Sequence, residues 1–269
     1  MSRILLVGCG KMGEALASGW LEQGRDPDTI MVVEPNQNFT RDLISKGVKF
    51  YKTADALPFD NPPKVVIFAV KPQVMDEVVP VYTRFVGTSV FISIAAGKTI
   101  GYFEKILGVD AAIVRVMPNT PAAVHRGISG AIGNTNVSTD QRNHCSLLIE
   151  AVSELHWLDD ESHIDIVTAI SGSGPAYVFY FMQSMLEAAL KMGFSPNDSK
   201  VLVSQTFEGA VKLFNESDLT PEKWMDRVAS KGGTTRAALD SMEDNNVKEL
   251  IKEAAYAAFD RATELGKEK

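Results

Sequence analysis

The first 157 residues alternate between short apolar runs and segments whose apolar positions follow helical spacing. Helical spacing covers residues 12–23, 40–46 and 78–85. Apolar runs typical of buried parallel strands cover residues 4–7, 30–33, 65–70, 90–94 and 112–116. Strands that alternate with helices predict an α/β fold, with a mostly parallel, doubly wound sheet and helices on both of its faces.

The pattern changes after Trp157, where strand-like runs stop and long helical segments follow. Residues 164–192 are apolar on nearly every side, which in a small domain favours burial against a partner subunit. Further helical spacing covers residues 201–214 and 247–265. The acidic stretch before residue 163 suits a helix start. We therefore expect one domain over residues 1–158 and a second, all-helical domain over residues 159–269.

Composition limits the partners of this chain. It has 269 residues, of which 45% are hydrophobic, and its formal charge of −7 disfavours nucleic acid as a partner. Its apolar runs are too short for a membrane span. Cys9 and Cys145 are too few for a disulfide framework, and the histidines lack metal-ligand spacing. We expect a soluble, cytoplasmic protein with no metal site, and neither nucleic acid nor a membrane as its partner.

A glycine loop follows the first apolar run. Gly8, Gly10 and Gly13 form a G-x-G-x-x-G pattern between a strand and a helix. The first glycine permits a tight turn, the second lets the backbone approach a pyrophosphate, and the third lets helix pack on strand. The helix then offers free N–H groups to phosphates. Because Glu34 follows about 20 positions later, at the end of the next run, this context predicts dinucleotide binding rather than a purely structural turn.

Other residues at the ends of the predicted strands leave alternatives open. Glu34 is either a partner for the ribose 2′-hydroxyl of NAD or a solvated loop acid, and Asn36 is an alternative contact to a phosphate. Lys71 is either a contact to coenzyme phosphate or ribose or an exposed loop lysine. Ala95 and Ala96 either leave room for a nicotinamide ring or form an ordinary turn.

A second glycine loop precedes a helical segment over residues 236–242. Gly232 and Gly233 leave backbone N–H groups uncovered at the positive end of that helix, and the following threonines suit its N-cap. One interpretation is a nest that binds a substrate carboxylate, with a threonine hydroxyl near the reacting atom. The other is a flexible loop with an ordinary helix cap.

Five segments occur in the order and spacing of a known family. They are residues 8–13, 69–72, 117–121, 171–177 and 231–235, which read GCGKMG, AVKP, MPNTP, SGSGPAY and KGGTT. The chain resembles pyrroline-5-carboxylate reductases nearly end to end. This resemblance implies a dinucleotide-binding Rossmann-type domain followed by an all-helical dimerisation and substrate-binding domain. It also implies a homodimer, sometimes assembled into a ring of dimers, with each active site shared between two subunits.

The resemblance further implies reduction of 1-pyrroline-5-carboxylate to L-proline, the last step of proline biosynthesis. The coenzyme would be NADPH, with NADH as the alternative, because Glu34 departs from members with small or hydroxylated residues there. The catalytic residue would be Thr235, whose hydroxyl would hydrogen-bond the ring nitrogen. The substrate contacts would be Glu161, Ser230, Gly232, Gly233, Thr234 and Thr235. The coenzyme contacts would be Val7, Gly8, Gly10, Lys11, Met12, Gly13, Glu34, Asn36, Ala69, Val70, Lys71, Pro72, Ala95, Ala96 and Asn119.

Two other functions fit parts of this pattern. A β-hydroxyacid dehydrogenase would share the architecture, but Tyr177 and Val178 stand where that class places its catalytic lysine. A non-catalytic dinucleotide sensor that dimerises through its helices needs the first glycine loop but not the second. Consumption of reduced coenzyme with pyrroline-5-carboxylate would separate the three functions.

Overall fold

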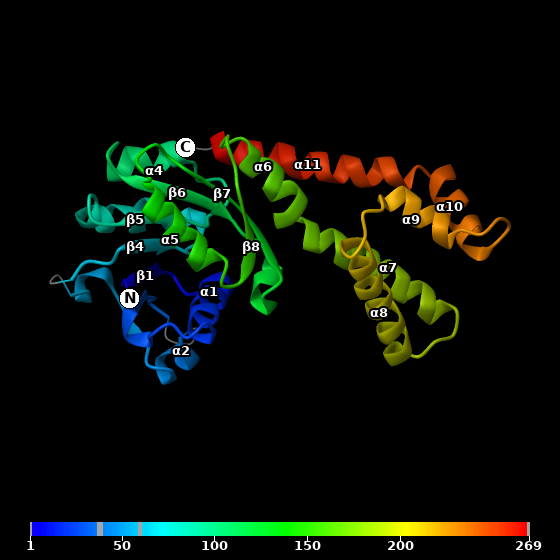
Figure 1. Ribbon diagram of the computed structural model, residues 1–269, viewed down its shortest axis with the longest axis horizontal. Helices are drawn as coiled ribbons and strands as arrows, with labels where there is room; N and C mark the ends of the chain where they lie inside the picture. Colours follow the sequence, from blue (N-terminus) through cyan, green and yellow to red (C-terminus); the bar gives the residue numbers. More distant parts are fainter. Residues whose placement is uncertain (1, 37–39, 59–60, 268–269) are drawn as a thin grey trace. The chain divides into compact units, whose positions relative to one another are not determined.

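The computed structural model describes residues 2–36, 40–58 and 61–267, and the chain divides into two compact units (Figure 1). Unit 1 comprises residues 1–173 and 258–269, and unit 2 comprises residues 174–257. The compact units therefore part after residue 173. The division of function between residues 1–158 and 159–269 stays a prediction.

The described residues of unit 1 contain an eight-stranded sheet with the order β3-β2-β1-β4-β5-β6-β7-β8. Neighbouring strands pair in parallel except β6 and β7, which are antiparallel, so the predicted mostly parallel sheet is confirmed. The strand order reverses beside β1, and ligands of such sheets bind at the carboxyl ends of the strands there. The strands are β1 (Ile4–Val7), β2 (Ile30–Val33), β3 (Lys49–Tyr51), β4 (Val65–Phe68), β5 (Val90–Ser93), β6 (Ala112–Met117), β7 (Gly127–Gly133) and β8 (Ser153–Trp157).

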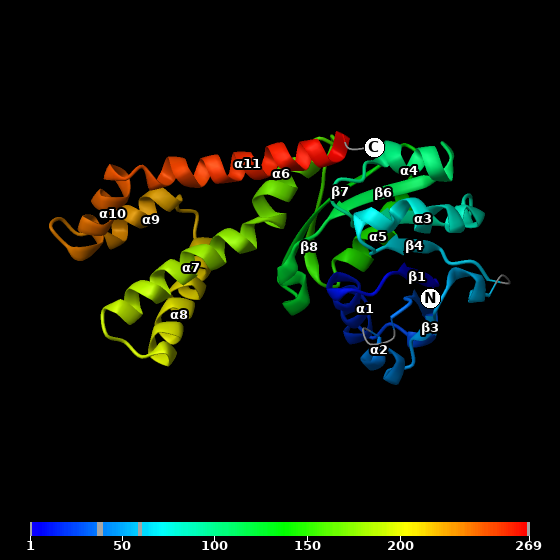
Figure 2. The ribbon, with the colours of Figure 1, turned by 180° about the vertical axis from the view of Figure 1, so that it is seen from behind.

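Helices cover both faces of this sheet, as the alternation of strands and helices predicts (Figure 2). Trp20 of α1 and Leu148 of α5 pack on one face, and Phe103 of α4 packs on the other together with Tyr82, which lies in the segment after α3. The helix expected over residues 78–85 is instead mostly a 3₁₀ segment, Val79–Phe85, with a proline in its first turn. The helices that lie wholly in unit 1 are α1 (Lys11–Glu22), α2 (Arg41–Ser45), α3 (Met75–Val78), α4 (Ile100–Leu107), α5 (Thr139–Ile149) and α6 (His163–Val167).

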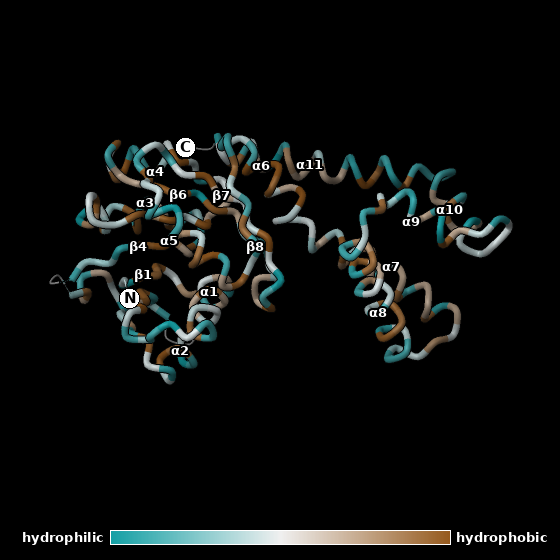
Figure 3. The backbone as a smooth tube through the Cα atoms, in the orientation of Figure 1, coloured by the Kyte–Doolittle hydropathy of each residue, from teal (hydrophilic) through white to brown (hydrophobic). Residues whose placement is uncertain are grey.

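The rest of the chain is helical, and its helices expose large apolar side chains. Phe179 and Tyr180 of α7 are 65% and 76% exposed. Figure 3 shows hydrophobic stretches along α7 and α8. Such faces fit the expected burial against a partner subunit. In the described part of the chain, no helix has the length and apolar character needed to cross a membrane. The helices are α7 (Gly174–Lys191), α8 (Pro196–Asn215), α9 (Pro221–Val228), α10 (Thr234–Asp244) and α11 (Val247–Lys267).

Candidate functional site

A cleft of about 680 Å³ opens in unit 1 beside the carboxyl ends of β1, β2 and β4. Predicted coenzyme contacts that line it are Val7, Gly8, Gly10, Glu34, Ala69, Val70 and Lys71. The lining also contains Lys52, Thr53 and Tyr82, which sequence reasoning missed. Lys52 and Thr53 follow β3, a strand of three half-buried residues that is too short to give a signal. The predicted contacts outside this lining are Lys11, Met12, Gly13, Asn36, Pro72, Ala95, Ala96 and Asn119.

The first glycine loop has the geometry that its pattern predicts. Gly8 has a φ of +88°, in the left-handed region, and a Cβ there would lie 2.6 Å from Val70 Cγ1. A Cβ on Gly13 would lie 2.7 Å from the carbonyl oxygen of Gly8. At Gly10, by contrast, a Cβ would meet no heavy atom of the described residues within 4 Å. Gly8 and Gly13 are therefore required by the fold, whereas Gly10 leaves space for a ligand.

The start of α1 can bind an anion. Gly10 is the N-cap of α1, and no side chain in the described part of the chain hydrogen-bonds to this cap. The first N–H groups of a helix lack partners within the helix, and they carry the positive end of its dipole. A pyrophosphate fits this position, because it would supply the missing acceptors without requiring any side chain at Gly10.

Glu34 is bound to the glycine loop itself. Its Oε2 accepts the backbone N–H of Cys9 at 2.8 Å, and its Oε1 accepts the backbone N–H of Asn36 at 2.9 Å. Burial, with the nearby Glu14 and Glu34 carboxylates, raises the pKa of the Cys9 thiol to about 12. Glu34 therefore lines the cleft as a half-buried side chain that is fixed to the glycine loop. Whether it accepts from a ribose hydroxyl stays a prediction.

Asn119 already uses both ends of its amide within unit 1. Its Oδ1 accepts the backbone N–H of Ile128 at 2.9 Å, and its Nδ2 donates to the carbonyl oxygen of Ser171 at 3.2 Å. These bonds join the segment after β6 to β7 and to the π-helical residues Thr168–Gly172 that follow α6. One N–H of the amide remains for a coenzyme contact, so that role stays a prediction.

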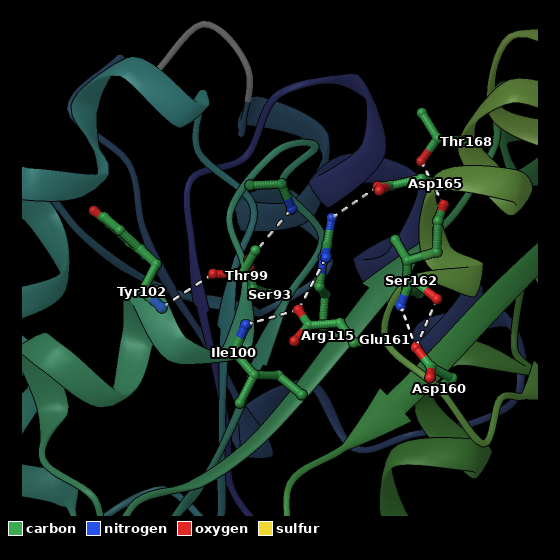
Figure 4. Close-up of polar contacts among 12 residues, drawn as sticks. Ser93, Thr99, Ile100, Tyr102, Arg115, Asp160, Glu161, Ser162, Asp165 and Thr168 are labelled. Atoms are coloured by element: carbon green, nitrogen blue, oxygen red, sulfur yellow. Dashed lines mark hydrogen bonds and ion pairs between the residues drawn. The ribbon is translucent and has the colours of Figure 1, made fainter. Parts of the chain in front are cut away.

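Glu161, which the family resemblance implied as a substrate contact, is held by other residues of unit 1. Its Oε1 accepts Arg115 Nη1 at 2.9 Å and the backbone N–H of Ile100 at 2.8 Å (Figure 4). Arg115 Nη2 also lies 3.8 Å from Asp165 Oδ1. Sequence reasoning missed Arg115, although a charge within a buried apolar strand is itself a signal. A direct contact between Glu161 and the substrate stays a prediction.

The second glycine loop lies in unit 2 at the start of α10. Gly232 has a φ of +74°, and the N–H of Gly233 donates to the carbonyl oxygen of Ser230 at 3.0 Å. A Cβ on Gly233 would collide with Ser230 Oγ. The predicted threonine cap is wrong: Gly233 is the N-cap, and no described side chain hydrogen-bonds to it. The helix begins at Thr234, so Thr234 and Thr235 lie in its first turn and their N–H groups are free for an anion.

Two of the histidines make contacts within unit 1. Among the residues that the structure describes, no three His, Cys, Asp or Glu residues are grouped so that they could hold a metal ion. His125 instead lies 2.9 Å from Glu22, and His144 lies 2.8 Å from the hydroxyl of Ser2. These are surface and packing contacts of unit 1.

The sheet, the glycine loop and the cleft define a dinucleotide-binding protein with a Rossmann-type domain. Residues 3–97 match the family model described as NADP oxidoreductase coenzyme F420-dependent, and residues 161–265 match the model described as pyrroline-5-carboxylate reductase dimerisation. The chain belongs to the pyrroline-5-carboxylate reductase family. It is 36% identical to the pyrroline-5-carboxylate reductase of Pseudomonas aeruginosa, covering 99% of this chain and 97% of that protein.

Solved structures show the same relationship. The pyrroline-5-carboxylate reductase of Coxiella burnetii has a TM-score of 0.89 and 33% identity, covering 99% of each chain. The pyrroline carboxylate reductase of Plasmodium falciparum, solved with NADP bound, has a TM-score of 0.89 and 31% identity, covering 98% of each chain. The predicted fold class is therefore confirmed, and NAD(P)H is the coenzyme class.

Proposed function

We propose that this chain reduces the C=N bond of 1-pyrroline-5-carboxylate to give L-proline, the last step of proline biosynthesis. The observation that carries this function is the similarity to reductases of that name over nearly the full length of both chains. The two glycine loops support it, because each ends at a helix whose first turn can bind an anion. NAD(P)H would supply a hydride to the imine carbon, and the ring nitrogen would take one proton.

The start of α10 is the proposed substrate anchor. The backbone N–H groups after Gly233 would bind the substrate carboxylate, as a helix N-terminus does for other anions. Thr235 is half-buried in the first turn, and its hydroxyl would hydrogen-bond the ring nitrogen. Because a threonine hydroxyl is a very weak acid, Thr235 would orient the ring and relay a proton from water. Orientation of this kind lowers the barrier without a change of charge on the protein.

A steady-state assay with pyrroline-5-carboxylate and either NADPH or NADH tests this function. We expect oxidation of the coenzyme to depend on the substrate and to yield proline. Bound coenzyme that is not consumed would favour a dinucleotide sensor. Turnover only with a hydroxyacid would favour a dehydrogenase, although Tyr177 and Val178 of α7 give that reaction no base.

Thr235→Ala tests the role of the hydroxyl within the same assay. We expect kcat to fall about 10- to 100-fold and the KM for pyrroline-5-carboxylate to rise, because the ring loses its orienting contact. The Kd for NADPH should stay unchanged. Ser241→Ala, an exposed substitution on the same helix, is the matched control and should behave as wild type. Unchanged turnover in Thr235→Ala would remove the proposed role of Thr235.

We also propose that the protein is a homodimer in the cytoplasm. The exposed apolar side chains of α7 and α8 and the match of residues 161–265 to a dimerisation family support the dimer. Cys9 and Cys145 are both buried thiols, which suits a reducing compartment. Light scattering on the purified protein gives the oligomeric state directly, and a mass of one chain at micromolar concentration would exclude the dimer. A ring of dimers stays a prediction that the same measurement tests.

A further inference from the structure

Arg115 is a charged residue inside the sheet. It is 3% exposed, and its neighbours on β6 are apolar. Because side chains alternate along a strand, Arg115 points to the same face as Ile113, the face that α4 covers. A buried charge is costly unless it is paired and hydrogen-bonded. Arg115 therefore needs partners inside the protein, and those partners indicate its structural role.

Those contacts lead to the first turn of α4. Arg115 Nη1 donates to Glu161 Oε1 at 2.9 Å, and the same oxygen accepts the backbone N–H of Ile100 at 2.8 Å (Figure 4). Ile100 is the first residue of α4, so Glu161 binds one of the N–H groups that a helix leaves open. The Glu161 carboxylate also lies at the positive end of the helix dipole. Arg115 Nε has no hydrogen-bond partner among the described residues, so the pair with Glu161 is its main stabilisation.

The segment between β5 and α4 is fixed at both ends by this arrangement. Ser93, the last residue of β5, is the register partner of Arg115, and its Oγ accepts the backbone N–H of Ala95 at 3.3 Å. At the other end, Glu161 holds the N–H of Ile100. Between these points lie Ala95 and Ala96, the predicted contacts to the nicotinamide. They follow β5, which is adjacent to β4 and therefore to the strand end that lines the coenzyme cleft.

We propose that Glu161 is a positioning residue, supported by Arg115, that holds residues 94–99 in the shape that receives the nicotinamide end of the coenzyme. Glu161 then acts on the reaction through this segment and not by contact with the substrate. This inference rests on the proposed function for its kinetic consequences. Its structural basis, a carboxylate shared between a buried guanidinium and a helix N–H, is independent of the substrate.

The test uses Arg115→Lys, Glu161→Gln and the double variant in the full-length protein. Glu161→Gln keeps an acceptor for Ile100 but loses the charge that pairs with Arg115. Arg115→Lys keeps the charge but loses the planar fork. We expect each single variant to bind NADPH about 3- to 10-fold more weakly and to lower kcat about 10-fold, because the ring is less well oriented. Binding of 2′-phospho-ADP-ribose, which lacks nicotinamide, should stay within about 2-fold of wild type, because the glycine loop holds that half.

The double variant separates positioning from direct contact. If Arg115 and Glu161 act through the same ion pair, the double variant should bind NADPH and turn over no less well than the weaker of the two single variants. A direct substrate contact by Glu161 would instead raise the KM for pyrroline-5-carboxylate in Glu161→Gln alone, with NADPH binding and Arg115→Lys unchanged. That result would overturn the inference. Equal weakening of NADPH and 2′-phospho-ADP-ribose would overturn it too, because it would indicate general loss of structure.

Two controls keep the outcomes distinct. Asp28→Asn breaks the exposed ion pair with Lys49 in the same unit and should leave all these measurements unchanged. Thermal unfolding of each variant shows whether it is folded, and the two conservative substitutions remain usable if a larger change at Arg115 prevents folding. If wild type fails to reduce pyrroline-5-carboxylate, the proposed function fails. The comparison of NADPH with 2′-phospho-ADP-ribose still tests the positioning role.

Discussion

Gly10→Ala should separate coenzyme binding from folding. Gly10 has a φ of −70° and a ψ of −173°, which alanine also adopts, and a Cβ there would meet no atom of the described ranges within 4 Å. Alanine is a poorer N-cap than glycine, but it loses less conformational entropy on folding, and the two effects offset each other. We therefore expect the free energy of unfolding to change by less than about 0.5 kcal/mol.

The same methyl group should weaken coenzyme binding strongly. Gly10 lines the cleft, and the second glycine of such a loop is where the backbone approaches the pyrophosphate. A methyl group would push the phosphates away from the N–H groups at the start of α1. Hydrogen bonds to a charged group contribute about 1.5–3 kcal/mol each, so losing one corresponds to a rise of roughly 10- to 100-fold in the Kd for NADPH.

Calorimetric titration with NADPH and chemical denaturation of the same samples measure both quantities. The matched control is Gly24→Ala, at a glycine with a φ of +81° and no described atom within 4 Å of its Cβ position. Gly24→Ala should lose about 1–2 kcal/mol of stability, from backbone strain alone, with the Kd for NADPH unchanged. Wild-type affinity for NADPH in Gly10→Ala would refute the placement of the pyrophosphate at this loop.

Two further predictions concern the glycine loop and the cysteines. Gly13→Ala places a Cβ 2.7 Å from the Gly8 carbonyl oxygen, so we expect a loss of about 2–4 kcal/mol in denaturation experiments, and an unchanged midpoint would contradict the packing. Burial raises the pKa of the Cys9 and Cys145 thiols from 9.0 to about 12. As the pH rises, the thiols ionise at lower pH in the unfolded chain than in the folded protein. The free energy of unfolding should therefore fall between pH 9 and pH 12, and an unchanged free energy of unfolding over that range would contradict the prediction.

Sequence patterning predicts the strands that form apolar runs and misses those that do not. β1, β2, β4, β5 and β6 are almost entirely apolar and buried because helices cover both of their faces. β7 is not predicted because glycines interrupt its apolar residues. A Cβ on Gly130 would lie 2.7 Å from Val167 Cγ2 of α6, so the residue that weakens the strand signal is required by a helix that sequence alone does not place there.

The candidate site likewise has features that a local sequence pattern predicts and features that it does not. The spacing of Gly8, Gly10 and Gly13 predicts the coenzyme loop, since the left-handed turn at Gly8, the N-cap at Gly10 and the contact of Gly13 with the Gly8 carbonyl oxygen all form within residues 8–13. The partners of Glu34 and Arg115 could not be predicted, because they depend on chain segments brought together by the fold. Glu34 binds the N–H of Cys9, 25 positions away, and Arg115 binds Glu161, 46 positions away.

The helix starts at the two glycine loops differ from those of α4, α5, α8 and α9 in a way that connects folding to ligand binding. The short helices α2, α3 and α6 also begin without a side-chain cap from a described residue. α1 and α10 begin after Gly10 and Gly233, with no described side chain bound to the first turn. By contrast, a side chain accepts a first-turn N–H in α4, α5, α8 and α9, at Thr99, Ser138, Ser195 and Thr220. Each such cap contributes about 1 kcal/mol. The starts of α1 and α10 lack this stabilisation, and a bound anion would supply it. A pyrophosphate at α1 and a carboxylate at α10 should therefore each raise the unfolding temperature.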